Sequence, residues 1–385
     1  MWLERKVFEK GLYNADFFRN RLRPFAYRMA NGDAEKVHEL ALNMLTRYED
    51  VLKVYGEGLD SPEIKIRIGN YEVIPFGTAA GLDKNGDALK PLSHIFGFMV
   101  PGTVVVNPRM GNPRPRVIAQ NNTIYNAQGF PSKGLDYFLG NIRRYREDGY
   151  ETPVIVSICG IPEPDIETGY DELKKLVKEL DEYADGFIWN PYSPNTESLK
   201  QLRKKDNFKR AAETIAEISG DKPKLVKLGP YDHDKNHWID RCGAWLEGGG
   251  DGFAALNTMM ISRDKVPSVE WGYPTAGMSG ECLKECRRNA IVTLRDEFPG
   301  SIIFSTGGID SAREAEEEFT YGATALKGYT PYVFNGFGLL QELVSGAREV
   351  VKTTGLNLAE YQDSRRNSPG RIRTAVTGYP LSYDS

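Results

Sequence analysis

The feature that most constrains the fold is a regular alternation between short apolar runs and longer amphipathic segments, which begins near Phe76. Strands are expected at Phe76–Ala79, Phe98–Val104, Val154–Ile158, Gly186–Trp189, Lys224–Leu228, Phe253–Leu256, Ile302–Ser305 and Ala323–Lys327. Helical patterns lie between most of them, for example at Asp171–Leu180, Phe208–Ile218, Trp238–Leu246 and Ala312–Phe319. Eight strand–helix repeats over ~280 residues predict an α/β fold, a closed (β/α)8 TIM barrel. A doubly wound sheet is the alternative, but no Gly-x-Gly-x-x-Gly follows the first strand.

Just before the barrel, the hydrophobic period is that of a strand pair. Ile64, Ile66 and Ile68 alternate with charged residues, and a Gly-Asn pair then leads into a second run, Tyr71–Ile74. This pattern predicts a β-hairpin, which we expect to close the bottom of the barrel.

The first sixty residues predict helices. One apolar stripe with four interleaved arginines covers Phe17–Met29, and a second covers Val37–Tyr48 after Asp33, a residue suited to a helix N-cap. Two such amphipathic helices suit a membrane interface, whereas the plainer alternative is packing on the main domain. We therefore expect an N-terminal extension (1–62), a barrel (63–361) and a flexible tail (362–385).

Overall composition excludes several classes of function. With 49 basic and 53 acidic residues, the net charge of -4 gives no electrostatic case for nucleic acid. Four cysteines fit a reduced compartment, and no apolar run approaches the ~18 residues that a membrane-spanning helix needs. His233 and His237 stand beside Asp232 and Asp234, but the two aspartates are expected to open a helix and to stabilise its N-terminus. No third ligand of suitable spacing follows, and we expect no metal.

Barrel active sites form at the carboxyl ends of the strands, and polar residues collect at these positions. The segment Asn190–Thr196 offers carboxamides and hydroxyls around two prolines, and Ser193 would project from a stiff turn. Asn and Ser are also ordinary turn residues, so a plain loop is the alternative. Lys84 follows the first strand and Lys227 ends the fifth, where each would supply a cation to an anionic ring or phosphate. A surface lysine is the alternative for Lys227.

Small residues after the last strands suggest a phosphate site. Gly307 and Gly308 follow strand seven, and Tyr329 and Thr330 follow strand eight. Ser279-Gly280 adds a hydroxyl and another backbone N–H. Backbone amides at such turns, next to helix N-termini, form the usual phosphate cradle of barrels. The set predicts a phosphate-bearing cofactor.

Taken in order, these segments resemble the dihydroorotate dehydrogenases, and most closely the class 2, quinone-dependent, membrane-associated branch. The resemblance rests on Ala79-Ala80-Gly81-Leu82-Asp83-Lys84, Gly111-Asn112-Pro113-Arg114-Pro115-Arg116, Ser193-Pro194-Asn195-Thr196, Gly307-Gly308-Ile309-Asp310 and Tyr329-Thr330. The segment Asp33–His38 resembles the helical extension that class 2 members carry. The similarity covers nearly the whole chain, from about Phe17 to Tyr361.

The resemblance implies an activity and a set of site residues. The activity is FMN-dependent oxidation of (S)-dihydroorotate to orotate in pyrimidine (UMP) biosynthesis, with electrons passed to a membrane quinone. FMN would be held by Ala79, Ala80, Gly81, Leu82, Asp83, Thr103, Ser157, Asn190, Lys227, Ser279, Gly280, Gly307, Gly308, Tyr329 and Thr330. The substrate would be held by Lys84, Asn126, Asn190, Asn195, Asn257 and Thr258. Ser193 would be the catalytic base, with Thr196 and Phe130 flanking the proton exit, and His38 and Tyr329 would lie on the quinone side.

The chain also departs from the family pattern. Ser157 stands where an asparagine is usual, Leu256 where a threonine is usual, and Ala119 where an arginine is expected near the quinone. A related FMN oxidoreductase that uses another cyclic substrate, or fumarate or NAD as acceptor, is the first alternative. A flavin-binding barrel without turnover is the second. By the resemblance we expect a peripheral protein on the cytoplasmic side of the cell membrane, attached through its N-terminal helices.

Overall fold

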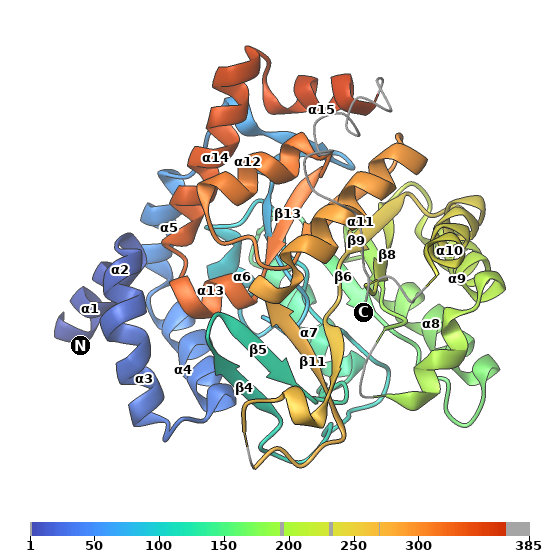
Figure 1. The fold of residues 1–385 in the computed structure, drawn as a ribbon, viewed down its shortest axis with the longest axis horizontal. Coiled ribbons are helices and arrows are strands. Elements are labelled where there is room, and N and C mark those ends of the chain that lie inside the picture. The colour runs from blue at the N-terminus through green and yellow to red at the C-terminus, as the bar shows by residue number, and fades with distance from the viewer. Residues whose placement is uncertain (1, 193–195, 231–233, 269, 367–385) are drawn as a thin grey trace.

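The computed structural model describes residues 2–192, 196–230, 234–268 and 270–366, which fold around one curled parallel sheet (Figure 1). Its strands pair in the order β3 (Phe76–Thr78), β13 (Ala325–Gly328), β12 (Ile302–Thr306), β9 (Gly252–Ala255), β8 (Lys224–Leu228), β7 (Gly186–Trp189) and β6 (Ile155–Ile158). Residues 98–104 lie between the two edge strands and bridge to both, at Gly77 on one side and at Val154 and Ile158 on the other. The predicted α/β barrel is confirmed.

The expected strand Phe98–Val104 is where the barrel wall differs from the prediction. These residues pair through isolated bridges and do not form a regular strand. Pro101 has no N–H to donate, and Gly102 has a φ of +111°, which lies outside the strand region. The backbone of Gly102 instead bonds to Gly81 and Asp83. The break therefore ties the loop after β3 to this segment.

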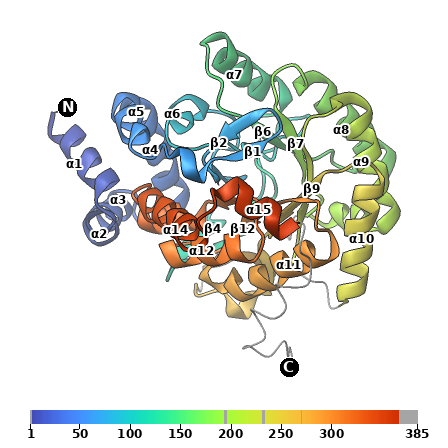
Figure 2. The same cartoon turned by 90° about the horizontal axis from the view of Figure 1, so that it is seen from above.

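Helices surround the sheet because each has one apolar face. They are α6 (Leu89–Ser93), α7 (Leu135–Glu147), α8 (Ile166–Leu180), α9 (Lys205–Ser219), α10 (Lys235–Glu247), α11 (Lys284–Glu297), α12 (Ala312–Thr320), α13 (Thr330–Asn335), α14 (Leu339–Thr354) and α15 (Leu358–Arg366). In α8, Leu173, Leu176 and Leu180 recur at helical spacing and are buried, and the Asp165 side chain caps the first turn. Figure 2 shows α7 to α11 as an outer arc around the strands.

A second, antiparallel sheet was not expected from the sequence. Its order is β10 (Met259–Ser262), β11 (Thr275–Gly280), β5 (Thr123–Asn126) and β4 (Val117–Gln120). Short 3-10 helices join the remaining segments at Pro62–Ile64, Glu197–Arg203, Arg263–Lys265 and Glu281–Leu283. The sheet joins insertions that follow two different barrel strands, and it brings β5 and β11 beside the strand ends.

The predicted hairpin is present as β1 (Ile66–Ile68) and β2 (Tyr71–Val73), paired antiparallel. The Tyr71 hydroxyl donates to Asp185, which precedes β7, at 2.5 Å. Gly69, in the turn, lies close to Pro223, just before β8. Both contacts are at the amino ends of barrel strands, and Figure 2 shows the hairpin inside the ring of helices. The hairpin therefore covers the bottom of the barrel, as expected.

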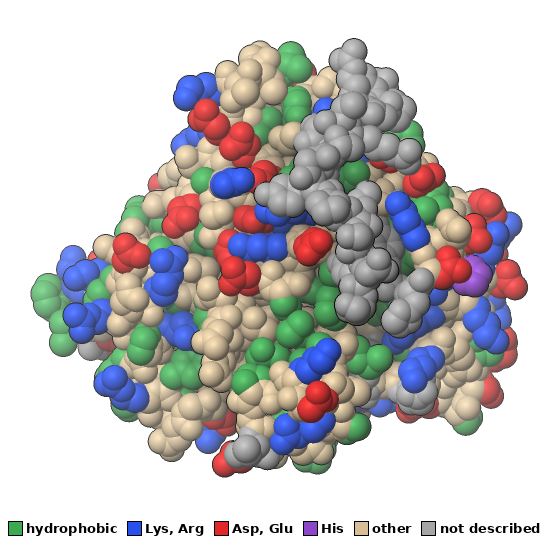
Figure 3. Space-filling view, in the orientation of Figure 1, with side chains coloured by type: hydrophobic (Ala, Val, Ile, Leu, Met, Phe, Trp, Pro, Cys, Tyr) green, Lys and Arg blue, Asp and Glu red, His purple; other side chains and the backbone are tan. Residues whose placement is uncertain are grey.

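The N-terminal extension contains more helices than the two expected. They are α1 (Trp2–Tyr13), α2 (Ala15–Phe17), a π-helical turn (Phe18–Leu22), α3 (Arg23–Met29), α4 (Ala34–Arg47) and α5 (Glu49–Glu57). The Asp33 side chain caps α4 as predicted, by accepting from the N–H groups of Glu35 and Lys36. In Figure 1 these helices lie together on one side of the barrel. On the face shown in Figure 3, acidic and basic side chains are interspersed.

The boundary expected after Tyr361 requires correction. Helix α15 continues to Arg366, and the Gln362 amide donates to the carbonyl groups of Ala323 and Thr324 beside β13. The buried Gln362 therefore belongs to the barrel. Residues 367–385 lie outside the described part of the chain.

Candidate active site

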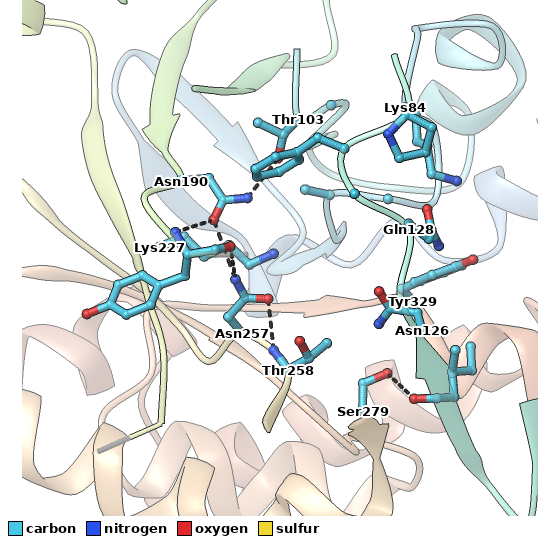
Figure 4. A pocket seen from close by; sticks show the side chains of 18 residues that line it. Lys84, Thr103, Asn126, Gln128, Asn190, Lys227, Asn257, Thr258, Ser279 and Tyr329 are labelled. Carbon is cyan, nitrogen blue, oxygen red and sulfur yellow. Dashed lines mark hydrogen bonds between the residues drawn. The ribbon is translucent and has the colours of Figure 1, made fainter. Parts of the chain in front are cut away.

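A pocket opens at the carboxyl ends of the barrel strands, under the small antiparallel sheet. Twelve of the predicted site residues line it, namely Ala80, Gly81, Lys84, Thr103, Asn126, Phe130, Asn190, Lys227, Asn257, Thr258, Ser279 and Tyr329. Figure 4 shows Asn190, Lys227 and Asn257 on one side and Asn126, Gln128 and Tyr329 on the other. The structure thus brings together residues from all parts of the sequence between 80 and 329.

One wall of the pocket is a connected row of neutral polar side chains. The Asn190 amide donates to the Thr103 hydroxyl at 2.8 Å, and that hydroxyl lies 3.0 Å from the hydroxyl of Ser157. The Asn257 amide lies 3.4 Å from the Asn190 side-chain oxygen and donates to the Tyr192 carbonyl at 2.7 Å. Because each group is fixed by its neighbour, the wall presents amides in set directions. Ser157 acts through Thr103 and does not line the pocket.

The opposite wall comes from the small sheet. The Asn126 amide, on β5, donates to the Gly277 carbonyl of β11 at 3.0 Å. The Ser279 hydroxyl lies 2.9 Å from the hydroxyl of Thr330, at the start of α13. These bonds fix the edge of β11 against the last strand of the barrel.

Two lysines give the otherwise neutral pocket its positive charge. Burial lowers the pKa of Lys227 to about 8. Burial also lowers the pKa of Lys84, an effect that the nearby Glu35 carboxylate opposes. An anionic ligand would favour the charged form of both side chains, because an opposite charge raises a lysine pKa.

The predicted phosphate cradle lies beside this pocket. Gly280, Gly308 and Thr330 line a smaller cavity next to it, with Asn122 and Asn335. A Cβ atom on Gly308 would stand 2.6 Å from the Gly280 carbonyl oxygen, and φ is +70° there. Only glycine fits so close an approach of two backbones. The buried Thr306 hydroxyl, at the end of β12, has no hydrogen-bond partner among the described residues.

A buried arginine supports this cradle from behind. Arg287 of α11 donates to the Gly307 carbonyl and forms ion pairs with Glu314 and Glu318 of α12. Glu318 in turn accepts from the Ser305 hydroxyl of β12. Burial alone would lower the pKa of Arg287, but the two carboxylates outweigh it and raise that pKa. The turn after β12 is therefore held by a network of charges.

On the side of the extension, His38 of α4 contacts Tyr329 edge-on, with ring centroids 5.7 Å apart. Burial, and to a smaller extent the neighbouring Lys84, lower the pKa of His38 to about 3. Where an arginine was expected, the Ala119 carbonyl accepts from Arg23 of α3 at 3.3 Å. The Arg23 guanidinium lies over the ring of Phe334, 4.2 Å from its centroid. The extension thus places a guanidinium at this position from a different segment.

Several predicted residues do not line the main pocket. Ala79, Leu82 and Asp83 are buried behind the loop after β3, and the Asp83 carboxylate accepts from the N–H groups of Asp87 and Ala88. Burial raises the pKa of Asp83 to about 6. Thr196 is buried and directly precedes the 3-10 helix Glu197–Arg203. Ser193 and Asn195 lie outside the described residues, so their predicted roles stay predictions.

Sequence reasoning missed six lining residues, which are Gly102, Ile124, Gln128, Gly129, Pro131 and Tyr192. Five of them lie in segments that do not end a regular barrel strand. Tyr192 lies within the predicted segment 190–196, and its carbonyl accepts a hydrogen bond from the Asn257 amide in the pocket wall. The signal available in the sequence was the Gln-Gly-Phe-Pro run at 128–131, which has turn character.

The described residues contain no group of three His, Cys, Asp or Glu side chains able to hold a metal ion. His233 and Asp232 lie outside that part of the chain. Asp234 caps α10 through the N–H groups of Asn236 and His237, which is the structural role expected for it. The pocket is therefore built from amides, hydroxyls and two lysines, and this donor set suits a planar ligand with carbonyl groups and negative charge.

Comparison with known proteins points to one family. The sequence model of the family described as dihydroorotate dehydrogenase matches residues 65–351. A dihydroorotate dehydrogenase (quinone) from Legionella pneumophila is 30% identical over 346 residues, which are 86% of this chain and 99% of the relative. One of the same name from Nitratiruptor is 30% identical over 286 residues, 73% of this chain and 79% of that one. The ligand-free crystal structure of the dihydroorotate dehydrogenase from Eimeria tenella superposes with a TM-score of 0.72 at 25% identity, covering 84% of this chain and 99% of the other.

Proposed function

The chain belongs to the dihydroorotate dehydrogenase family, and we propose on this basis that it oxidises (S)-dihydroorotate to orotate and passes the electrons to a quinone. The relatives named as quinone-dependent support this acceptor. The reaction is the oxidation step of pyrimidine biosynthesis. The observation that carries the proposal is a fixed row of amides that lines one pocket together with two lysines, at the carboxyl ends of the barrel strands.

The donor set fits the substrate. Dihydroorotate has a carboxylate and a ring of alternating amide N–H and carbonyl groups. Lys84 would pair with the carboxylate, and Asn126, Asn190, Asn257 and Thr258 would meet the ring. Asn195, outside the described residues, completes the predicted set. A ligand without these groups would leave buried amides unpaired, which gives selectivity.

The residues also fit FMN. Gly280 and Gly308 line the smaller cavity, where a phosphate would meet the backbone. The Thr306 hydroxyl, which has no hydrogen-bond partner among the described residues, lies at the end of β12, and Lys227 lies near the end of β8. Ala79 to Asp83, Thr103, Ser157, Asn190, Ser279, Tyr329 and Thr330 would complete the site. FMN, when bound, supplies the acceptor for the two electrons and the hydrogen that leave C6 of the substrate.

The proton that leaves C5 needs a base, which we assign to Ser193. A serine hydroxyl is a weak base, so the site must carry the proton away. Phe130 lines the pocket with a φ of +55°, and Thr196, three residues after Ser193 in the sequence, is buried. Phe130 and Thr196 would enclose a water beside Ser193 and separate it from bulk solvent. Ser193→Ala should slow flavin reduction by ~10²–10⁴-fold.

The N-terminal extension is the proposed route by which the quinone acceptor reaches the pocket. Trp2, Leu3, Phe25 and Met29 are exposed apolar side chains on α1 and α3, and Figure 3 shows hydrophobic side chains at the end of the molecule where α1 begins. No helix in the described residues is long and apolar enough to cross a bilayer. These helices would lie on the cytoplasmic surface of the cell membrane, and a quinone would then reach the side of the pocket formed by His38 and Tyr329.

Anaerobic mixing of the FMN-loaded protein with dihydroorotate tests the activity. Bleaching of the flavin absorbance with formation of orotate is expected, and no bleaching would overturn the proposal. The acceptor is tested in the same preparation with quinone, fumarate and NAD. Turnover with fumarate or NAD, and none with quinone, would overturn the acceptor assignment while leaving the oxidation of dihydroorotate in place.

A further inference from the structure

A buried arginine joins the N-terminal extension to the wall of the pocket. Arg116, which is only 8% exposed, donates through Nη1 to the carbonyl groups of Met110 and Asn112, at 2.6 and 2.7 Å. It therefore closes the loop 110–116 on itself. The other edge of the guanidinium, Nε and Nη2, remains for a different partner.

That partner is Glu35, in the first turn of α4. Arg116 Nε lies 3.2 and 3.1 Å from its two carboxylate oxygens, and Nη2 lies 3.0 Å from Oε1. The Glu35 side chain is 12% exposed. A forked contact of this kind fixes direction as well as distance. The extension and the loop are thus locked to each other across 81 residues of sequence.

The loop is bonded in turn to the pocket wall. Asn112 donates through its backbone N–H to the Gln128 carbonyl at 2.9 Å and through its side chain to the Ala127 carbonyl at 2.7 Å. A Cβ atom on Gly111 would meet the Gln128 carbonyl oxygen and would stand 2.7 Å from Arg116 Nη1. The loop is therefore pressed between the guanidinium and the segment 127–131.

This segment forms one side of the pocket. Gln128, Gly129, Phe130 and Pro131 all line it, and Phe130 is held at a φ of +55°. Backbone in this region is costly for a residue with a side chain and persists only where the surroundings impose it. Several charged groups around Lys84 affect its pKa. Among the acidic groups Glu35 raises this pKa the most, whereas Arg116 and Arg114 lower it.

We propose that Glu35 is a positioning residue for dihydroorotate, which holds the segment 127–131 and the surroundings of Lys84 through Arg116. The proposal rests on the function proposed above. It assigns the extension a role in binding the substrate, in addition to its role towards the acceptor. Through the ion pair of Glu35 with Arg116, the packing of α4 affects the binding of the substrate as well as the reaction with the acceptor.

The test compares two substitutions on the same helix. Glu35→Gln removes the buried partner of Arg116, and Glu39→Gln, one turn later, removes the 57% exposed partner of Arg114 in the same loop. In the full-length FMN-loaded protein, Glu35→Gln should raise the KM for dihydroorotate and the Kd for orotate about tenfold, within the usual range of coupling between sites. The KM for a soluble quinone should change less than about twofold, and Glu39→Gln should leave all three constants unchanged.

Hydrogen exchange separates this proposal from the proposed function, because it needs no substrate. The amides of Asn112 and Ala127 should exchange faster in Glu35→Gln than in Glu39→Gln. If dihydroorotate does not reduce the wild-type flavin, the proposed function fails while the exchange result still decides the positioning role. Arg116→Lys, which keeps the charge, should fall between the wild type and Glu35→Gln. Equal exchange and equal KM values in the two glutamate variants would overturn the proposal, and so would a loss confined to the quinone.

Discussion

Arg287 and Arg116 support two different parts of the site with the same chemistry, the turn after β12 and the segment 127–131, and the comparison shows what the extension contributes. Each guanidinium donates to a backbone carbonyl of a pocket loop and pairs with glutamate. The carboxylates of Arg287 lie on α12, two elements further along the barrel, and the side chain is 0% exposed. The carboxylate of Arg116 lies on α4, outside the barrel.

The difference lies in what must be in place before each loop is ordered. The cradle at Gly307 needs only α11, β12 and α12, which pack as consecutive units of the barrel. The wall at 127–131 needs the extension to be docked. The proposed phosphate end of the site is therefore a property of the barrel, whereas the proposed substrate end depends on two parts of the chain. The following predictions test this asymmetry.

The largest loss of stability is expected for Arg287→Met. It leaves Glu314 and Glu318 buried without their main counter-charge, and removing one partner of a buried ion pair costs about 3–5 kcal/mol. Urea unfolding of the FMN-free protein measures the change. Arg288→Met is the control, because Arg288 pairs with Glu314 and Glu317 but is 35% exposed. A loss for Arg287→Met no greater than that of the control would contradict the role given to this network.

Arg116→Met should cost less, about 1.5–3 kcal/mol, the range for hydrogen bonds to a charged group. The reason is that Glu35 lies at the junction between α4 and the loop 110–116, and its carboxylate becomes hydrated if α4 moves away. Glu318 is buried inside the barrel and cannot be hydrated in this way. The same urea experiment gives the value. If Arg116→Met destabilised the protein as much as Arg287→Met, the junction would be as integral to the fold as the barrel, and the comparison would fail.

Acid should weaken the junction before it affects the cradle. His38 has its pKa lowered from 6.5 to about 3, mainly by burial. Between these values the unfolded chain binds the proton and the folded chain does not, so stability falls as the pH drops below 6.5. The loss from this group is about 1.4 kcal/mol at pH 5.5. From pH 7.5 to pH 5.5, the unfolding free energy of the wild type should fall by this amount relative to that of His38→Gln. A constant difference would remove His38 as the cause.

The smallest change in stability is expected for Arg114→Met. Arg114 pairs with Glu39 at 2.7 Å and with Glu35 at 3.3 Å, but its side chain is 44% exposed, and exposed ion pairs contribute only about 0–1 kcal/mol. The effect should shrink further in 0.5 M salt, because exposed charges are screened. A salt-independent loss above that range would show that the junction rests on the outer ion pair as well as on Arg116.

The sequence by itself determined the elements whose signals are local. The barrel strands follow from apolar runs that are buried on both faces, and the surrounding helices from apolar stripes at helical spacing. The N-caps at Asp33 and Asp234, the hairpin turn at Gly69 and the glycines at 307–308 each reflect a backbone requirement met by adjacent residues. For the same reason, polar residues at regular strand ends, such as Asn190, Lys227 and Asn257, could be selected from the sequence, and they line the pocket.

Only the tertiary structure decided the parts that depend on distant partners. The small sheet pairs β5 with β11, which are more than 140 residues apart, and the sequence of neither strand identifies the other as its partner. The break in the barrel wall at Gly102 depends on bonds to the loop after β3. The pairing of Arg116 with Glu35 and the position of Arg23 beside Ala119 also join the extension to the barrel. The sequence shows which residues are charged. Which of them form buried ion pairs with one another depends on the packing of the whole chain.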